Sequence, residues 1–151
     1  MSVIERVPVS FERVDTFADT TRAAYERVKA KAFEYYVSRG SVEGFDQEDW
    51  FRAETMLILK PDVIARRFNE DVFIEIMLPG CLPEELHLQI NPNGMLVCTE
   101  PNADEQQVFR IAHFPEPVDM DTIDVEFVGE ALRVTATVSD HDDLSYRRHT
   151  A

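Results

Sequence analysis

The stretch that decides the fold spans residues 72–99, VFIEIMLPGCLPEELHLQINPNGMLVCT. Along residues 72–77 one row of side chains is Val72, Ile74 and Ile76 and the opposite row is Phe73, Glu75 and Met77. Apolar and polar side chains alternate along residues 86–90, and such a period of two is typical of antiparallel strands. The Pro79-Gly80 break separates these two runs. An Asn93-Gly94 pair follows, and such a pair readily supplies the positive φ of a tight hairpin turn. The stretch therefore predicts three consecutive antiparallel strands.

Further strands are predicted on both sides of this stretch. Short alternating runs separated by turn residues recur about every eight to twelve residues, which favours a sandwich. These runs cover residues 63–68, 108–114, 121–127 and 132–138. The predicted fold class is therefore mainly β, with an immunoglobulin-like antiparallel β-sandwich over residues 60–139.

A two-helix hairpin is predicted before the sandwich, over residues 15–59. Asp15 or Thr16 is suited to cap the first helix and Asp46 the second. Gly40 is a typical stop, and Arg39 just before it suits the negative end of the helix dipole. The expected apolar faces are Phe17, Thr21, Ala24, Val28, Ala32 and Tyr35 on the first helix, and Trp50, Ala53 and Leu57 on the second. The aromatics expected to form most of the shared core, rather than to stack a ligand, are Phe33, Tyr36, Phe45 and Trp50.

The two ends of the chain are predicted to be an arm, residues 1–14, and a flexible tail, residues 140–151. Pro8 forbids a helix in the arm, and Val7-Pro8-Val9 is held extended by its β-branched residues and proline. The alternative is an ordinary terminal strand or loop. No secretory signal or membrane-spanning run is visible, so a soluble, cytoplasmic protein is expected.

The charge balance excludes some partners. The chain has 29 acidic and 15 basic side chains and a formal net charge of −14. Such a surface repels nucleic acid and anionic lipid, so neither nucleic acid nor a membrane is an expected partner. The same charge would help to keep bound apolar material in solution.

No enzyme activity, cofactor or metal site is predicted. The sequence has no nucleophile elbow, phosphate loop or dinucleotide-binding glycine pattern. Cys81 and Cys98 belong to no metal-ligand pattern, and the cluster His141-Asp142-Asp143 lacks a rigid frame for a metal ion.

The helical segment resembles a short bacterial helical domain of unknown function, whose pattern is an aromatic helix, Arg-Gly, Gly, an acidic run, Trp and Ala-Glu. The resemblance covers residues 22–57 and implies no activity. It is carried by Ala32-Phe33-Glu34-Tyr35-Tyr36, Arg39-Gly40, Gly44, Asp46, Glu48-Asp49-Trp50 and Ala53-Glu54.

The strands resemble the alpha-crystallin domain of small heat-shock proteins over residues 62–139. The matching residues are Leu78-Pro79-Gly80, Pro83-Glu84-Glu85-Leu86 with Leu88 and Ile90, Asn93-Gly94-Met95-Leu96, Phe114-Pro115, Val118-Asp119, Ile123, and Leu132 with Val134. The resemblance implies an ATP-independent holdase, which binds unfolding client proteins and prevents their aggregation. The short polar connection at residues 99–108 and a tail without an Ile-x-Ile motif depart from the family, so a homodimer or small oligomer is expected.

The resemblance also implies a peptide-binding groove between two strands. One wall comprises Leu86, Leu88 and Ile90, and the other comprises Ile123, Val125 and Phe127. We hypothesise that Val7-Pro8-Val9 docks in this groove, in its own subunit or in a neighbouring one, by adding a strand.

Two functions remain open at this point: a holdase chaperone, and a co-chaperone-like interaction module that binds one specific partner. The hairpin has three open roles, which are to cap the sandwich, to bind clients or to dimerise.

Overall fold

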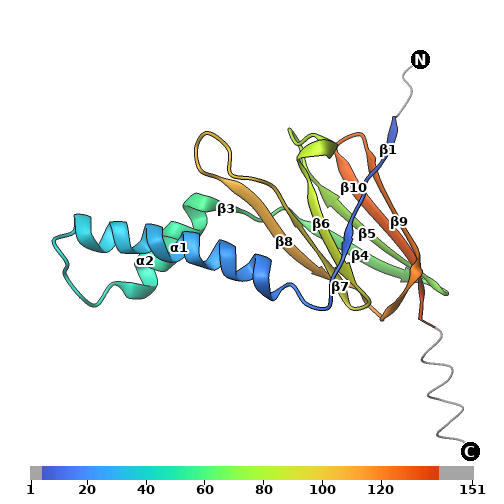
Figure 1. The fold of residues 1–151 in the computed structure, drawn as a ribbon, viewed down its shortest axis with the longest axis horizontal. Helices are drawn as coiled ribbons and strands as arrows, with labels where there is room; N and C mark the ends of the chain where they lie inside the picture. Colours follow the sequence, from blue (N-terminus) through green and yellow to red (C-terminus); the bar gives the residue numbers. More distant parts are fainter. Residues whose placement is uncertain (1–4, 140–151) are drawn as a thin grey trace, which may run out of the picture.

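The computed structural model describes residues 5–139, in which two five-stranded sheets pack face to face and a helical hairpin extends from them (Figure 1). Sheet A has the strand order β1-β9-β10-β5-β4, and sheet B has the order β2-β6-β7-β8-β3. The strands of sheet A are β1 Arg6–Pro8, β4 Val63–Phe68, β5 Asp71–Met77, β9 Val118–Val128 and β10 Ala131–Val138. Those of sheet B are β2 Glu12–Arg13, β3 Ile58–Leu59, β6 His87–Asn91, β7 Gly94–Cys98 and β8 Gln107–His113. The remaining elements are α1 Ala18–Ser38, α2 Asp46–Leu57 and the 3₁₀ turn η1 Pro83–Glu85. The predicted mainly β sandwich with a two-helix hairpin before it is confirmed.

The sandwich core is built from the alternate positions that the sequence indicated. In β5, Val72, Ile74 and Ile76 are buried, while the residues between them are half-buried. The side chains of both sheets meet between the layers, since successive residues of a strand point to opposite faces. Fully buried members of this core include Ile74, Ile76, Leu78, Ile90, Met95, Val97, Leu132 and Val134.

Two of the strand pairs are parallel, which the sequence did not predict. β2 pairs with β6, and β3 pairs with β8, each over two residues. The antiparallel prediction was wrong for these pairs because a two-residue strand has no periodicity to detect. Both strands are supplied by connecting segments, β2 from the arm before α1 and β3 from the chain directly after α2.

The turn between β6 and β7 differs from the prediction. Neither Asn93 nor Gly94 has a positive φ. Instead the Asn91 carboxamide oxygen accepts hydrogen bonds from the backbone N–H groups of Asn93, at 2.9 Å, and Gly94, at 3.0 Å. Glycine is needed at position 94 for space, because a Cβ there would lie 2.6 Å from the carbonyl oxygen of Ala112.

Gly94→Ala should therefore destabilise the protein although alanine can adopt the backbone angles. The new methyl group must push apart two paired strands, since its obstacle is backbone rather than a movable side chain. We expect a loss of about 1–3 kcal/mol in the free energy of unfolding, the range for overpacking. Urea unfolding measures it, with Gly44→Ala as a control in which nothing lies within 4 Å of the new methyl but φ is +98°. No measurable loss for Gly94→Ala would show that space is not the reason for glycine at position 94.

The hairpin core is smaller than predicted. It consists of Ala24, Val28, Ala53, Leu57 and Ile58, with Ala32, Tyr35, Trp50 and Phe109 packed against it. Of the four aromatics predicted for this core, only Trp50 contributes. Phe33 is 63% exposed and Phe45 is 38% exposed, and Tyr36 contacts Phe33 at a ring-centroid distance of 5.9 Å. Alanine residues on both helices fill part of the contact, and Phe33, Tyr36 and Phe45 lie outside it.

The helix ends differ in part from those that the sequence predicted. α1 and α2 begin after Phe17 and Phe45, and neither of these residues makes a side-chain cap. The Thr16 hydroxyl oxygen accepts a hydrogen bond from the Ala18 N–H at 3.4 Å, whereas Asp46 lies within the first turn of α2 and does not precede it as the predicted cap. Gly40 does follow the end of α1, with φ at +79°, as predicted for a glycine stop. Arg39 was predicted to interact with the negative end of the α1 dipole, and it also donates two hydrogen bonds to Asp49 of α2.

Candidate functional site

The N-terminal arm closes one side of the sandwich. β1 pairs antiparallel with β9, which places Val7 opposite Phe127, and the Val9 N–H donates to the Val125 carbonyl at 3.1 Å. β2 then pairs in parallel with β6, and the Val14 N–H donates to the Ile90 carbonyl at 3.1 Å. The arm thus crosses from the β9 edge of sheet A to the β6 edge of sheet B, as its course in Figure 1 shows.

The structure brings the six predicted groove residues and the arm together. Leu86, Leu88, Ile90, Val125 and Phe127 are buried, and Ile123 is half-buried against the same core. Val7, Val9 and Phe11 of the arm pack against that core as well. Pro8 lies in β1 opposite Glu126. Proline is tolerated there because β1 is the outermost strand of its sheet and needs no donor on its free side.

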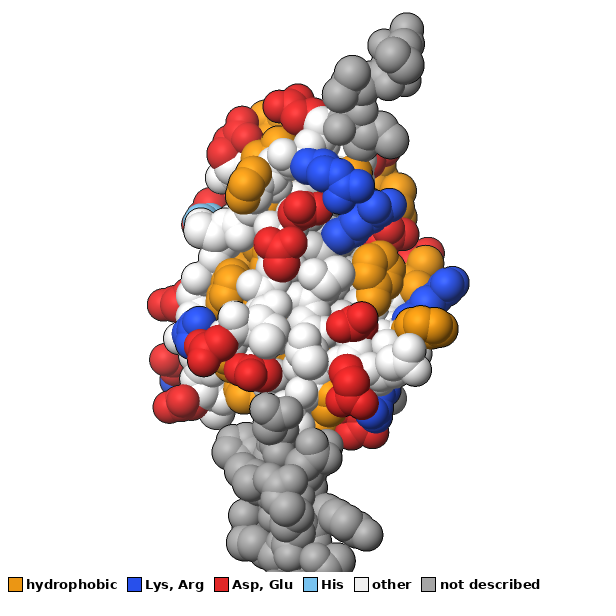
Figure 2. Space-filling model, turned by 90° about the vertical axis from the view of Figure 1, so that its right-hand side faces the viewer, with side chains coloured by type: hydrophobic (Ala, Val, Ile, Leu, Met, Phe, Trp, Pro, Cys, Tyr) orange, Lys and Arg blue, Asp and Glu red, His pale blue; other side chains and the backbone are white. Residues whose placement is uncertain are grey.

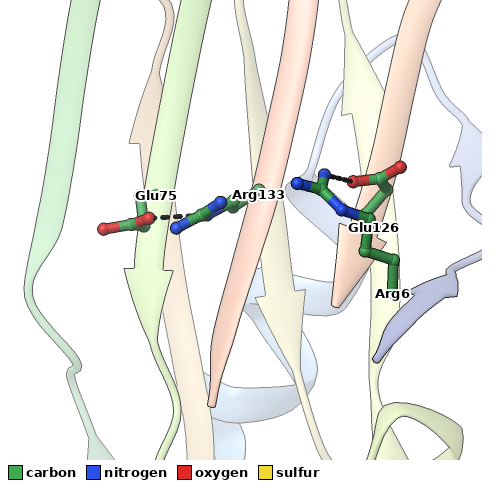
Figure 3. A network of polar contacts seen from close by, with 4 residues as sticks. All are labelled: Arg6, Glu75, Glu126 and Arg133. Atoms are coloured by element: carbon green, nitrogen blue, oxygen red, sulfur yellow. Dashed lines mark hydrogen bonds and ion pairs between the residues drawn. The ribbon is translucent and has the colours of Figure 1, made fainter. Parts of the chain in front are cut away.

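Ion pairs hold both ends of the arm. A row of charged side chains crosses sheet A, and Figure 3 shows its two contacts: Arg133 donates to Glu75 at 2.8 Å, and Arg6 donates to Glu126 at 3.0 Å. Arg133 lies opposite both Glu75 and Glu126 in the strand register. At the other end of the arm, Arg13 lies 3.5 Å from Asp121. The sequence alone did not indicate these pairs, because the partners lie far apart along the chain, 58 residues for Arg133 and Glu75 and 120 for Arg6 and Glu126.

Two open hollows flank the docked arm. One, of about 550 Å³, lies between Phe11 of the arm and the groove residues Leu86 and Leu88, with Glu100 on its wall. The other, of about 430 Å³, lies beside Val7 and Phe127. Its remaining lining residues are Glu5, Cys81, Leu82, Pro83, Glu84 and Gly129. Open space therefore remains beside the arm at Phe11 and at Val7.

Both cysteines lie at these hollows as free thiols. Cys98 lines the first hollow and Cys81 the second. Burial raises the pKa of each thiol, and the neighbouring carboxylates Glu100 and Glu85 raise it further. The thiolate form is thereby disfavoured, which argues against a nucleophilic role.

The hairpin carries exposed apolar side chains, two of which, Phe33 and Phe45, were predicted to lie in its core. We call the surface that they form the hairpin surface and define it by its exposed large side chains: Tyr25, Phe33, Val37, Val42, Phe45, Phe51 and Met56. Phe51 is 70% exposed. The loop that joins α1 and α2 lies at the end far from the strands in Figure 1, so part of this surface is held away from the sandwich.

Polar contacts fasten the hairpin to the outer face of sheet B. Arg27 of α1 donates to the Gln107 side chain and to the carbonyl oxygen of Glu105. Thr20 donates to the Gln89 side chain of β6 at 3.0 Å. The hairpin is thus packed against the sandwich, and its exposed side chains leave room for contact with another partner.

A charged pair locks the two helices together near the loop. Both guanidinium NH₂ groups of Arg39 donate to the carboxylate of Asp49, which is 5% exposed. The hydrogen bonds from Arg39 hold the pKa of Asp49 below its usual range, although burial opposes this. The same carboxylate raises the pKa of Arg39. Because a lowered pKa favours the ionised carboxylate in the folded chain, the pair stabilises the hairpin at neutral pH.

The Asp49 carboxylate should make the hairpin acid-sensitive. Its contribution is complete above the pKa of an unfolded aspartate, ~3.9, and is lost as the pH falls through the lower pKa of the folded state. Asp49→Asn should lower the melting temperature at pH 7 and reduce the further fall on acidification to pH 3. Circular dichroism at 222 nm follows the helices, and Asp19→Asn is the control because the Asp19 side chain is 99% exposed. Equal effects of the two substitutions at pH 7 would contradict the proposed lock.

The remaining predictions concern metal sites and membrane-spanning segments. Within residues 5–139 no group of three or more His, Cys, Asp or Glu side chains is arranged to hold a metal ion. The cluster His141-Asp142-Asp143 lies outside the described residues. No described helix is long and apolar enough to cross a bilayer.

Comparisons with known proteins match the hairpin and, more distantly, the sandwich. Residues 23–57 match a family described as a protein of unknown function (DUF2934), which confirms the resemblance of the helical segment. No curated protein matches the chain significantly. Among solved structures, heat shock protein 16.0 from Schizosaccharomyces pombe is 17% identical over 66% of this chain and 87% of that chain, with a TM-score of 0.48. HSP18.5 from E. histolytica is 21% identical over 54% of this chain and 91% of that chain, with a TM-score of 0.47.

Proposed function

We propose that this chain is an ATP-independent holdase, which binds unfolding proteins through apolar surface and prevents their aggregation. The observation that carries the proposal is the hairpin surface. Seven large apolar side chains are exposed on the hairpin, against five on the rest of the described chain, Leu59, Ile64, Phe68, Met77 and Leu82. This concentration of exposed large apolar side chains on one small element is the feature through which we propose that clients bind.

The charge of the chain supports the same function. Acidic side chains are spread over the face shown in Figure 2, and basic ones are fewer, with their largest group in the upper part of the view. A formal net charge of −14 keeps like-charged complexes apart. A holdase needs both properties together, since the apolar hairpin surface binds the client and the acidic remainder keeps the complex in solution.

The groove is the second binding element of the proposal. The arm occupies it through short strand pairs and partly buried side chains, so an extended segment of a client can replace it by the same strand addition. The arm of one copy can also enter the groove of another with identical contacts, which is the usual route to a swapped dimer. We therefore propose a homodimer or small oligomer formed by arm exchange.

Suppression of aggregation tests the function directly. The full chain is mixed at near-stoichiometric ratio with a heated or reduced client, and light scattering is followed without ATP. A holdase suppresses the scattering of several unrelated clients. No suppression, together with tight binding to a single partner, would reject the holdase in favour of the co-chaperone-like interaction module.

The mass in solution tests the proposed arm exchange. Light scattering coupled to size exclusion should give a mass that rises with concentration above that of the 17.4 kDa chain. Val7→Ser with Val9→Ser should bring the mass back toward that of the single chain. A mass that is unchanged by these substitutions would exclude the arm as the link between copies.

A further inference from the structure

β4 is the one long outer strand of the two sheets. The outermost strands are β1 and β4 in sheet A and β2 and β3 in sheet B. β1 has three residues, one of them a proline, and β2 and β3 have two residues each, whereas β4 has six. No strand of residues 5–139 pairs with the outer side of β4. A long edge of this kind offers unpaired backbone N–H and C=O groups to a further strand.

Ile64, Arg66 and Phe68 form the outer face of β4, because their partners in β5 alternate with its buried residues. Ile64 is 42% exposed and Phe68 is 76% exposed. β4 contains two arginines and no acidic residue, although the chain has a net charge of −14. Arg67 pairs with Glu116 at 3.0 Å, whereas Arg66 forms no ion pair in the described part of the chain. The edge therefore suits an extended segment that brings both carboxylates and apolar side chains.

The chain leaves the sandwich beside the end of this strand. β10 ends at Val138, whose N–H donates to the carbonyl oxygen of Glu70 at 2.8 Å. Glu70 lies in the turn that joins β4 to β5, and Figure 1 shows this turn at the same end of the molecule as the end of β10. An open hollow of about 440 Å³ is lined there by Asp71 and Thr137, among others. The segment that follows Ser139 thus starts near Phe68 with open space beside it.

The composition of that segment matches the edge. Residues 140–151, which lie outside the described residues, read DHDDLSYRRHTA, with three aspartates first. Leu144 and Tyr146 follow, and two residues spaced in this way share one face of an extended segment.

The segment is also long enough to reach the edge. A strand added beyond β4 lies three strand spacings from β10, about 14 Å, which four or five extended residues cover at about 3.3 Å each. This distance brings Asp142 and Asp143 to the Phe68 end of β4, within reach of the long Arg66 side chain. The residues that follow can then run back along β4.

We propose that residues 140–151 add to the outer side of β4 in their own subunit, as a further antiparallel strand of sheet A. The aspartates pair with Arg66, and Leu144 and Tyr146 cover the exposed side chains of Ile64 and Phe68. The added strand closes the one long open edge, so two copies cannot pair through β4. Such a cover is useful whether or not the chain binds clients, and it leaves the N-terminal arm on the other edge of sheet A untouched.

Amide hydrogen exchange of the full chain tests the added strand. Leu144→Pro with Ser145→Pro removes two neighbouring N–H donors, so a ladder hydrogen bond is lost whichever of them faces β4. The amides of β4 that do not bond to β5 should then exchange roughly threefold to tenfold faster than in the parent chain. Those of β10 should keep their protection. Thr150→Pro with Ala151→Pro is the matched control and should change nothing, because these residues lie beyond the length of β4.

Charge reversal tests the contact with Arg66. Arg66→Glu should speed the exchange of the same β4 amides, because it places a like charge beside the aspartates. Adding Asp142→Lys and Asp143→Lys should slow the exchange again. Arg22→Glu is the control, since it makes the same change of net charge at a side chain of α1 that is 69% exposed. It should leave the exchange of β4 unchanged.

Three results would overturn the added strand as described. The first is equal exchange of the β4 amides in the parent chain and in Leu144→Pro with Ser145→Pro. The second is protection that falls on dilution of the parent chain, because the covering segment would then come from a second copy. The third is a failure of the reversed charges to restore protection to Arg66→Glu, which would show that the aspartates do not lie beside Arg66.

Discussion

Replacing Phe33 and Phe51 with serine should raise at least tenfold the amount of chain needed to halve client aggregation. The two rings are 63% and 70% exposed, so their removal leaves no cavity in the hairpin. Burying such a side chain against a partner is worth about 1.5–3 kcal/mol before ordering costs. Removing two rings should therefore weaken the binding free energy for a client by more than about 1.4 kcal/mol, which corresponds to a tenfold change in affinity.

The matched control for the hairpin variant is Phe68→Ser. Phe68 is the most exposed phenylalanine outside the hairpin, at 76%, and lies in β4 of the sandwich. Phe68→Ser should leave the suppression of client aggregation unchanged. The melting temperatures of the hairpin variant and of Phe68→Ser should both stay close to that of the parent chain. If both variants lost suppression of client aggregation equally, clients would bind exposed rings anywhere on the chain and not specifically those of the hairpin.

Val7→Ser with Val9→Ser should release the arm and lower the stability of the sandwich. Both valines are partly buried against the core, so their replacement should cost about 1 kcal/mol each, less than full burial. For a chain of this length the melting temperature should fall by roughly 4–8 °C. The backbone chemical shifts of Leu88, Val125 and Phe127 should change, since these residues line the groove that the arm fills.

Val37→Ser with Val42→Ser makes the same chemical change away from the groove. Both valines are 51% exposed on the hairpin. The backbone chemical shifts of the groove residues and the melting temperature should therefore stay near those of the parent chain. If the arm substitutions also leave the chemical shifts of the groove residues unchanged, the arm does not dock in the groove in solution. The proposal that the groove binds extended segments would then lose its basis.

The sandwich could be predicted because its pattern is local. In β5 and β10 alternate residues face the core, so the period of two is present in the sequence itself. The hairpin could be predicted for the same reason, from the four-residue spacing of Ala24 and Val28 on one helix and of Ala53 and Leu57 on the other. Gly40 could be placed after the end of α1 because its positive φ requires a residue without a Cβ.

The apolar character of the hairpin rings did not reveal which of them are buried. Phe33 and Trp50 are both large aromatics at helical positions, yet Trp50 packs on the core and Phe33 lies outside it. The difference depends on how closely the two helices approach, which Ala24 and Ala53 permit and which Arg39 and Asp49 reinforce. Such a contact between helices is not a property of either helix alone.

The sequence by itself determined the strands at residues 72–99, the sandwich and the presence of a helical pair, since these depend on the spacing of apolar residues along the chain. Tertiary structure alone decided the course of the arm, the parallel pairs of β2 and β3, and the crowding that requires glycine at position 94. The physical reason is the distance along the chain. Arg6 and Glu126, or Gly94 and Ala112, meet only after the layers have packed, and no local period records which distant residue will be the neighbour.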